Sequence, residues 1–334
     1  MTTSTATPTA GSGALASVAR SWKDNVSLFS PRRVATRFGP PLLGVLVFCL
    51  LWSRASASID TTLGEIPGPT AVWRQVNVLY AEHQAERARA AAFHERQEAR
   101  RADILARDPA ADIPVMRYTG KPTFLDQIAT SLTTVFAGFL VASLVAIPLG
   151  ILCGTSAVIN AGLSPLIQVF RPVSPLAWLP IVTMVVSALY VSADPFVQKS
   201  FITSAVTVAL CSLWPTLINT ALGVSSIDKD LLNVGRVLRL SWTTTLTRIV
   251  IPSALPLIFT GLRLSLGVGW MVLIAAEMLA QNPGLGKFVW DEFQNGSSDS
   301  LARIMVAVFT IGIIGALLDR VMSAIHAAVD VGKA

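Results

Sequence analysis

Residues 225–256 read SSIDKDLLNVGRVLRLSWTTTLTRIVIPSALP, a polar and charged stretch inside a very hydrophobic half of the chain. Read as a helix, its first part has an apolar face and a charged face. These faces consist of Ile227, Leu231, Val234 and Leu238 on one side and of Lys229 and Arg236 on the other. An amphipathic segment between two membrane spans must lie outside the hydrocarbon, where a soluble partner can reach it. Pro252 and Pro256 mark the point at which the chain returns to the bilayer. An ordinary interhelical loop is the alternative.

The composition indicates an integral membrane protein. Hydrophobic residues make up 52% of the 334 residues and charged residues only 14%, and the mean hydropathy is +0.59. Soluble domains carry roughly a quarter charged residues, so this chain falls outside their range. The net charge of +6 has no basic stripe interleaved with aromatic residues. The sequence therefore predicts no nucleic-acid partner.

Apolar runs that follow residue 127 predict five membrane spans, since a span needs about 20 apolar residues. These spans are expected at 128–153, 160–192, 201–223, 254–279 and 301–325. The 160–192 span is interrupted at Arg171-Pro172 and at Ser174-Pro175, because proline frees backbone groups that must be satisfied elsewhere. Gly150 and Gly154 form a small-xxx-small pair, which indicates either close helix contact or a turn.

The N-terminal region predicts one further span. Residues 1–34 are rich in Ser, Thr, Ala and Gly and are expected to form a disordered tail. The apolar run Pro41–Trp52 reaches spanning length when it is extended to 35–59. A cleaved signal peptide ending at Ala55-Ser56-Ala57 is the alternative, but the preceding basic region is too long for one. We therefore expect an uncleaved first helix.

Residues 60–127 form an insertion in which hydrophobicity collapses. Leu79 to Arg107 is dense in Ala, Glu and Arg without a continuous apolar stripe, which predicts a solvated helix or helical hairpin that ends at Pro109. His83 and His94 lack suitably spaced metal-ligating partners, so no metal site is expected.

The spacing within 225–256 resembles the cytoplasmic loop of binding-protein-dependent ABC transporter permeases. Their signature is Glu-Ala-Ala, three residues, Gly, nine residues and Ile-x-Leu-Pro. Here Asn233-Val234-Gly235 stand at the Glu-Ala-Ala positions, Arg239 at the glycine and Ile249-Val250-Ile251-Pro252 at the end. The gaps are kept, whereas the acidic residue and the loop glycine are missing. Three further stretches resemble the permeases of nitrate importers in the nitrate/bicarbonate/cyanate/sulfonate/taurine group: RPVSPLAWLPIVTMVVSALY (171–190), SLWPTLINT (212–220) and GLRLSLGVGWMVLIAAEMLAQNPGLG (261–286).

The resemblance implies an all-α membrane protein of six transmembrane helices with the type I ABC importer (MetI-like) permease fold. Its five-helix core would be 128–327, and 226–241 would be the coupling helix that docks on cytoplasmic ATPase subunits. The implied ATPase-coupling residues are Asn233, Val234, Gly235, Arg236, Leu238 and Arg239. ATP and Mg²⁺ would be bound by those partner subunits, and this chain would hold no cofactor, metal or catalytic residue. It would form a homodimer, receive nitrate from a periplasmic binding protein, and serve nitrogen assimilation. Sulfonate or taurine, bicarbonate and cyanate are alternative cargoes.

Three charged residues in the apolar half are candidates for the translocation path. Arg171 lies beside the proline break and Arg263 lies in the fifth span. Intramembrane charge is costly and commonly faces a cavity or a partner, and a guanidinium suits a small oxyanion. Glu277, near the outer end of the same span, is a possible partner for either arginine. The alternative is that both arginines lie near the interface and bond backbone carbonyls or lipid phosphate.

The charge distribution predicts the orientation in the bacterial inner membrane. Residues 1–37 and the 226–248 loop are net positive, whereas 281–300 is net negative, which places both termini and the loop in the cytoplasm. A secondary anion transporter is a rival, but it would more commonly show inverted repeats or several buried acids. A membrane-anchored enzyme would need its chemistry in the alanine-rich 60–126 segment, where no nucleophile–base set is found.

Overall fold

The structure is a computed structural model, which describes residues 31–58, 60–61, 64–109, 114, 116–191 and 197–331. Most of the tail predicted at 1–34 therefore lies outside the described residues. The chain divides into two compact units that meet at Pro69 and Thr70, and each is described by itself.

The first unit contains one long helix and a small hairpin. Helix α2 (Pro31–Ser56) begins four residues before the predicted span of 35–59 and ends three residues before its end. Its segment Gly39–Ser56 is long and apolar enough to cross a membrane. Strands β1 (Asp60–Thr61) and β2 (Gly64–Glu65) follow as an antiparallel pair in which Asp60 lies opposite Glu65.

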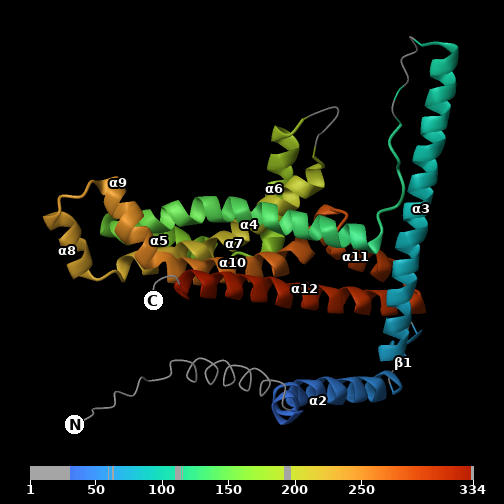
Figure 1. The fold of residues 1–334 in the computed structure, drawn as a ribbon, viewed down its shortest axis with the longest axis horizontal. Helices are drawn as coiled ribbons and strands as arrows, with labels where there is room; N and C mark the ends of the chain where they lie inside the picture. The colour runs from blue at the N-terminus through green and yellow to red at the C-terminus, as the bar shows by residue number, and fades with distance from the viewer. Residues whose placement is uncertain are drawn as a thin grey trace, which may run out of the picture. The chain divides into compact units, whose positions relative to one another are not determined.

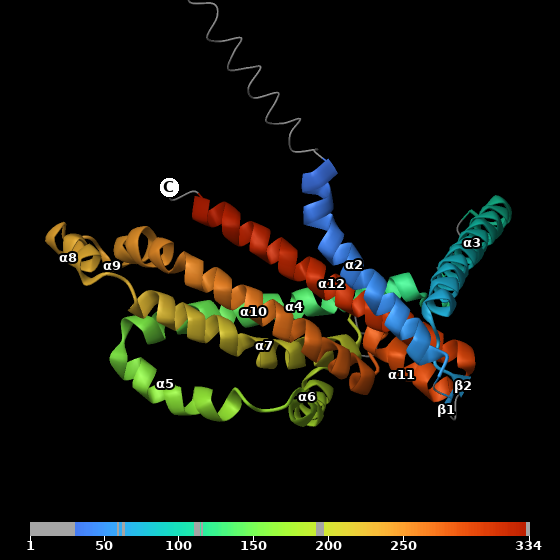
Figure 2. The same ribbon diagram turned by 90° about the horizontal axis from the view of Figure 1, so that it is seen from below.

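Four long helices form the body of the second unit. They are α4 (Phe124–Thr155), α7 (Lys199–Ser225), α10 (Ile251–Ala280) and α12 (Ser298–Val331). Figures 1 and 2 show them running alongside one another, and α7 is the helix against which both α4 and α10 pack most extensively. Their apolar composition and length make each of them a candidate membrane span.

Glycines allow α4 and α7 to approach closely. A Cβ on Gly150 would lie 2.6 Å from the Thr220 Cβ, and one on Gly154 would lie 2.5 Å from the Val224 Cβ. Both positions therefore require glycine for helix contact. Of the two interpretations of this pair, close packing is correct, and α4 continues past both residues to Thr155.

The predicted third span is broken in the middle. Helix α5 (Ala157–Phe170) and helix α6 (Pro175–Leu189) meet at an angle of 101°. The break falls at the predicted proline positions, where Pro175 opens α6 and the Ser174 hydroxyl accepts a hydrogen bond from the Leu176 N–H at 3.3 Å. The described chain has five candidate spans, or six when this bent pair is counted as one.

Short helices close the two ends of the bundle. At one end, called the α8 end, lie α8 (Lys229–Val237), α9 (Trp242–Thr245) and the π-helical turn η1 (Leu246–Val250). The π-turn runs directly into α10, so the helical segment begins at Trp242, well before the predicted residue 254. At the other end, called the α11 end, lies α11 (Leu285–Asn295).

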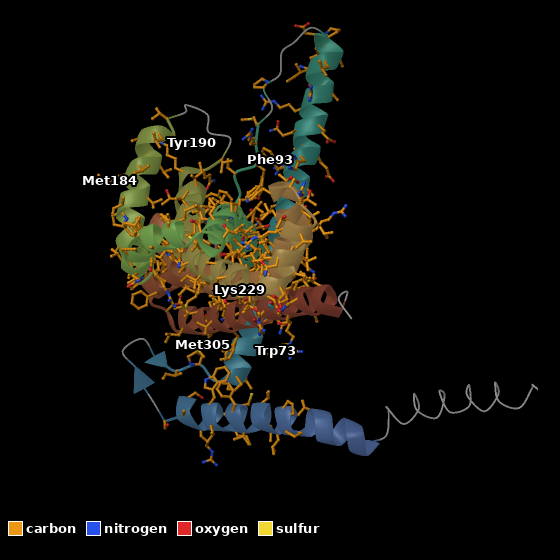
Figure 3. All side chains as sticks on the ribbon, turned by 90° about the vertical axis from the view of Figure 1, so that its left-hand side faces the viewer. Trp73, Phe93, Met184, Tyr190, Lys229 and Met305 are labelled. Atoms are coloured by element: carbon orange, nitrogen blue, oxygen red, sulfur yellow. The ribbon has the colours of Figure 1, made fainter. Side chains whose placement is uncertain are left out.

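The helical part of the insertion is one 39-residue helix, α3 (Pro69–Arg107), so the helical-hairpin alternative is wrong. It crosses the α11 end and runs crosswise to the long helices, as Figures 1 and 3 show. Gln75 Nε2 donates to Asp299 Oδ1 at 2.9 Å, and the His83 ring Nδ1 lies 2.7 Å from Thr123 Oγ1. Ion pairs join Arg87 to Asp126 and Arg303 to Glu82. These polar contacts fix the first half of α3 on the bundle.

Candidate functional site

Helix α8 lies inside the stretch predicted as a coupling helix, but it is shorter than 226–241. The Asp228 carboxylate accepts from the Asp230 N–H at 2.9 Å and caps its start. At its end the Leu240 N–H donates to the Gly235 carbonyl and the Arg239 N–H donates to the Arg236 carbonyl, both at 3.0 Å. This pair of bonds is a Schellman motif, which needs a left-handed residue after the helix.

Arg239 is that left-handed residue, with a φ of 49°. It is the position at which the related loops carry glycine. Glycine adopts this conformation without the steric cost that a Cβ imposes. The register proposed from the sequence therefore agrees with the backbone, although the side chain here is an arginine.

The apolar stripe of α8 points away from the rest of the chain. The exposed fractions are 43% for Leu231, 53% for Val234 and 64% for Leu238. Ile227, the first residue of the predicted apolar face, precedes α8 and packs against the core, and the inward face of α8 itself is made by Leu232 and Gly235. A Cβ on Gly235 would lie 3.1 Å from the Ile249 Cδ1, so α8 sits close to η1 there.

A hollow of about 210 Å³ lies beside this contact, between α8, α9, η1 and the end of α4. Arg236 and Trp242 line it together with Gly235. The Arg236 guanidinium donates to Asn233 Oδ1 at 3.2 Å and is exposed. Among the six predicted coupling residues, only Gly235 is therefore buried within the chain, and the other five are accessible to a partner.

Arg263 of α10 is paired with Asp319 of α12. Its Nε and Nη2 donate to the two carboxylate oxygens at 2.5 and 2.8 Å, which is a bidentate ion pair. Both side chains remain about half exposed on the surface of the bundle. Asp319 is missing from the sequence-based candidates, although an acid inside the apolar run of α12 is a signal of intramembrane pairing.

Arg171 lies at the break between α5 and α6. It is exposed, and within the described part of the chain its guanidinium makes no hydrogen bond or ion pair. Helix α5 has 14 residues and is therefore about 21 Å long. Figure 2 shows α5 ending part-way along the bundle, where the chain bends toward α6.

Glu277 is fully buried at the end of α10 and contacts neither arginine. Its carboxylate accepts from the Ser131 hydroxyl at 2.8 and 2.9 Å and from the Gly286 N–H at 3.0 Å. The predicted pairing with an arginine is wrong because 14 residues, or about 21 Å of helix, separate Glu277 from Arg263. Glu277 instead joins α4, α10 and the start of α11.

The comparison with protein families identifies the architecture. The family described as the binding-protein-dependent transport system inner membrane component matches residues 146–331, which is more than half of the chain. The chain belongs to this family. The matched region begins within α4 and contains α8 and the other core elements of the permease.

Curated relatives of the permease include two kinds of transport protein. The nitrate import permease NrtB of Synechococcus elongatus is 41% identical over 197 residues, which cover 59% of this chain and 67% of the relative. NrtB of Synechocystis sp. is 41% identical over 194 residues, covering 58% and 66%. The bicarbonate transport permease CmpB of Synechocystis sp. is 36% identical over 282 residues, covering 84% and 85%. The permease thus spans about two thirds of the length of these nitrate permeases.

A solved structure shares the fold. A chain of the MetNI methionine ABC transporter superposes with a TM-score of 0.52 over 62% of this chain and 95% of that one, at 15% identity. The MetI-like permease fold expected from the sequence is therefore confirmed.

Replacing Arg239 with glycine is expected to stabilise the end of α8 in this permease by about 1 kcal/mol, because a left-handed residue with a Cβ is strained. Slower amide hydrogen exchange across residues 229–240 would show it. Leu238→Gly is the matched control, because the φ of Leu238 is −74° and glycine brings no relief there. Equal or faster exchange in Arg239→Gly would contradict the assigned strain.

Proposed function

We propose that this permease is the membrane-spanning subunit of an ATP-driven importer that carries a small oxyanion, nitrate first, by alternating access. The observation that carries the importer assignment is the solvent-exposed apolar stripe Leu231–Val234–Leu238 on α8, in the loop where the family contacts its ATPase. Nitrate is favoured by the 41% identity to nitrate permeases.

The assembly around the permease follows from this assignment. The α8 end faces the cytoplasm, where ATPase subunits hold ATP and Mg²⁺ and cover the stripe. A second copy of the chain completes the path, and a binding protein delivers the anion at the α11 end. Both termini then lie in the cytoplasm of a bacterial cell, with the spans in the inner membrane. Hydrolysis takes place on the ATPase subunits.

Arg171 is the better candidate for contact with the anion. Its guanidinium has no carboxylate partner among the described residues, whereas Asp319 neutralises Arg263. The bend between α5 and α6 beside Arg171 supports this role, because in our proposal the path passes this bend and a planar fork of donors there can bind a planar oxyanion. Arg263 then serves to hold α10 against α12, and Glu277 holds the α11 end.

Bicarbonate is the second candidate cargo. The similarity to bicarbonate permeases covers 84% of the chain and so extends across α3, beyond the residues that the family description matches. Bicarbonate is also a planar anion of single charge. The same arginine could therefore bind either ion, and the binding protein would set the choice.

Reconstitution separates the candidates. Liposomes that contain the permease, its ATPase subunits and its binding protein are expected to take up isotope-labelled nitrate when ATP is supplied. Arg171→Gln should lower this uptake at least tenfold, and Arg171→Lys, which keeps the charge, should lose less. Uptake of bicarbonate, taurine or cyanate in place of nitrate would overturn the cargo. Uptake that needs no ATP would overturn the importer class, and unchanged uptake in Arg171→Gln would remove Arg171 from the path.

A further inference from the structure

Helix α3 carries an exposed apolar stripe that its contacts with the bundle do not use. Its first turns bury Val72, Gln75 and Leu79. Beside that face lies what we call the Trp73 stripe, which consists of Trp73, Val76 and Tyr80 at helical spacing. Trp73 is 69% exposed and Tyr80 is 57% exposed. Two large aromatic side chains on one side of a helix indicate a surface that something apolar covers.

The direction of α3 relative to the long helices sets the depth of its first turns. The helix runs crosswise to the long spans and therefore lies along the plane of the membrane. Its contacts with the bundle are made to Asp299 and Asp126, which lie in the first turns of α12 and α4. Figure 3 shows Trp73 on the part of α3 that extends past α12, to the side of the bundle and not above it.

We propose that the first three turns of α3 lie in the headgroup region of the bilayer, with Trp73 and Tyr80 as interfacial anchors. Trp and Tyr prefer this region because their rings are apolar and their N–H and O–H groups still reach water. The second half of α3 differs, since it exposes Arg96, Arg100, Arg101 and Arg107 between acidic residues and is suited to water. The anchor holds the base of the inserted helix while its far half remains free for soluble contacts.

Spin labels test this placement in the full-length chain reconstituted in phospholipid nanodiscs. Cys49, Cys153 and Cys211 are first replaced by alanine, and a label is then attached at Trp73→Cys or at Tyr80→Cys. Ala81→Cys is the control, because Ala81 is exposed on the face of α3 opposite the bundle. Collisions with oxygen, which concentrates in lipid, are compared with collisions with a water-soluble nickel chelate.

The expected result is that oxygen collisions exceed nickel collisions at Trp73→Cys and at Tyr80→Cys, and that the ratio is reversed at Ala81→Cys. A water-like ratio at all three positions would overturn the anchor. Protection of Trp73→Cys and Tyr80→Cys from both reagents would also overturn it, since a second copy, the binding protein or α2 would then cover the stripe. None of these readouts depends on transport, so failure of the proposed function would leave this test intact.

Discussion

Val234→Asp is expected to abolish ATP-driven uptake while the permease remains folded. Val234 is 53% exposed on α8, so an aspartate at this position would still reach water in the isolated permease. In the assembled importer the ATPase would cover this position, and an aspartate there would bury an unpaired charge. Such a charge costs several kcal/mol, which corresponds to a loss of docking of a hundredfold or more. Uptake and ATPase binding by the reconstituted permease would measure the loss.

Two further variants isolate the effect of the apolar stripe. Leu238→Asp lies on the same stripe and should behave in the same way as Val234→Asp. Lys229→Ser changes an exposed residue on another face of α8, and it should retain both uptake and binding. To show that it is folded, each variant must elute as the intact permease and keep normal amide hydrogen exchange in α4 and α7. If Val234→Asp and Leu238→Asp bind the ATPase and transport as well as the unchanged chain, α8 is not the coupling element.

The spans could be predicted from the sequence because lipid permits few alternatives. A run of about 20 apolar residues in a membrane forms a helix, and closely spaced prolines inside such a run favour a break without requiring one. The bend after Phe170 therefore lies where Pro172 and Pro175 indicated. The alignment of the 225–256 loop with the family signature was also predictable. Arg239 stands at the position of the family's glycine, and it adopts the positive φ that favours glycine.

The orientation of α8 could not be predicted in the same way. An amphipathic pattern indicates which residues share a helix face. It does not indicate whether that face packs on the same chain or on a partner protein. Here Leu231 and Val234 are exposed, while the inward face depends on Gly235, whose missing side chain allows contact with Ile249. Hydrophobic periodicity gives no weight to a glycine, so it could not predict that Gly235 lets α8 approach Ile249.

Polar contacts between residues far apart in the chain could not be predicted from the sequence either. Arg263 and Asp319 are 56 residues apart and meet only because α10 packs on α12. Glu277 finds its partners 146 residues earlier in α4 and nine residues later at the start of α11. Each charge was visible in the sequence, but its partner depends on which helices are neighbours.

Glu277→Ala is expected to destabilise the α11 end by about 2–3 kcal/mol, because it leaves the buried donors of Ser131 and Gly286 without an acceptor. The Ser131 hydroxyl also accepts from the Leu285 N–H at 2.8 Å, so the loss would spread to the first turn of α11. A Cβ on Gly284 would lie 2.1 Å from the Glu277 carboxylate, which shows how tightly the chain encloses this group. Hydrogen exchange across residues 281–295 should accelerate.

Glu277→Gln separates the charge of this residue from its shape. The amide keeps one acceptor oxygen but turns a donor toward groups that also donate, so it should lose about half as much as alanine. Thr207→Val is the control for a buried polar deletion, because among the described residues the Thr207 hydroxyl bonds only the Thr203 carbonyl of its own helix. If exchange in α11 stays unchanged in Glu277→Ala, packing of Leu285 and Phe288 holds this end, and the buried carboxylate does not. If Thr207→Val accelerates the same segment, the effect reflects general loosening of the bundle and not a local latch at Glu277.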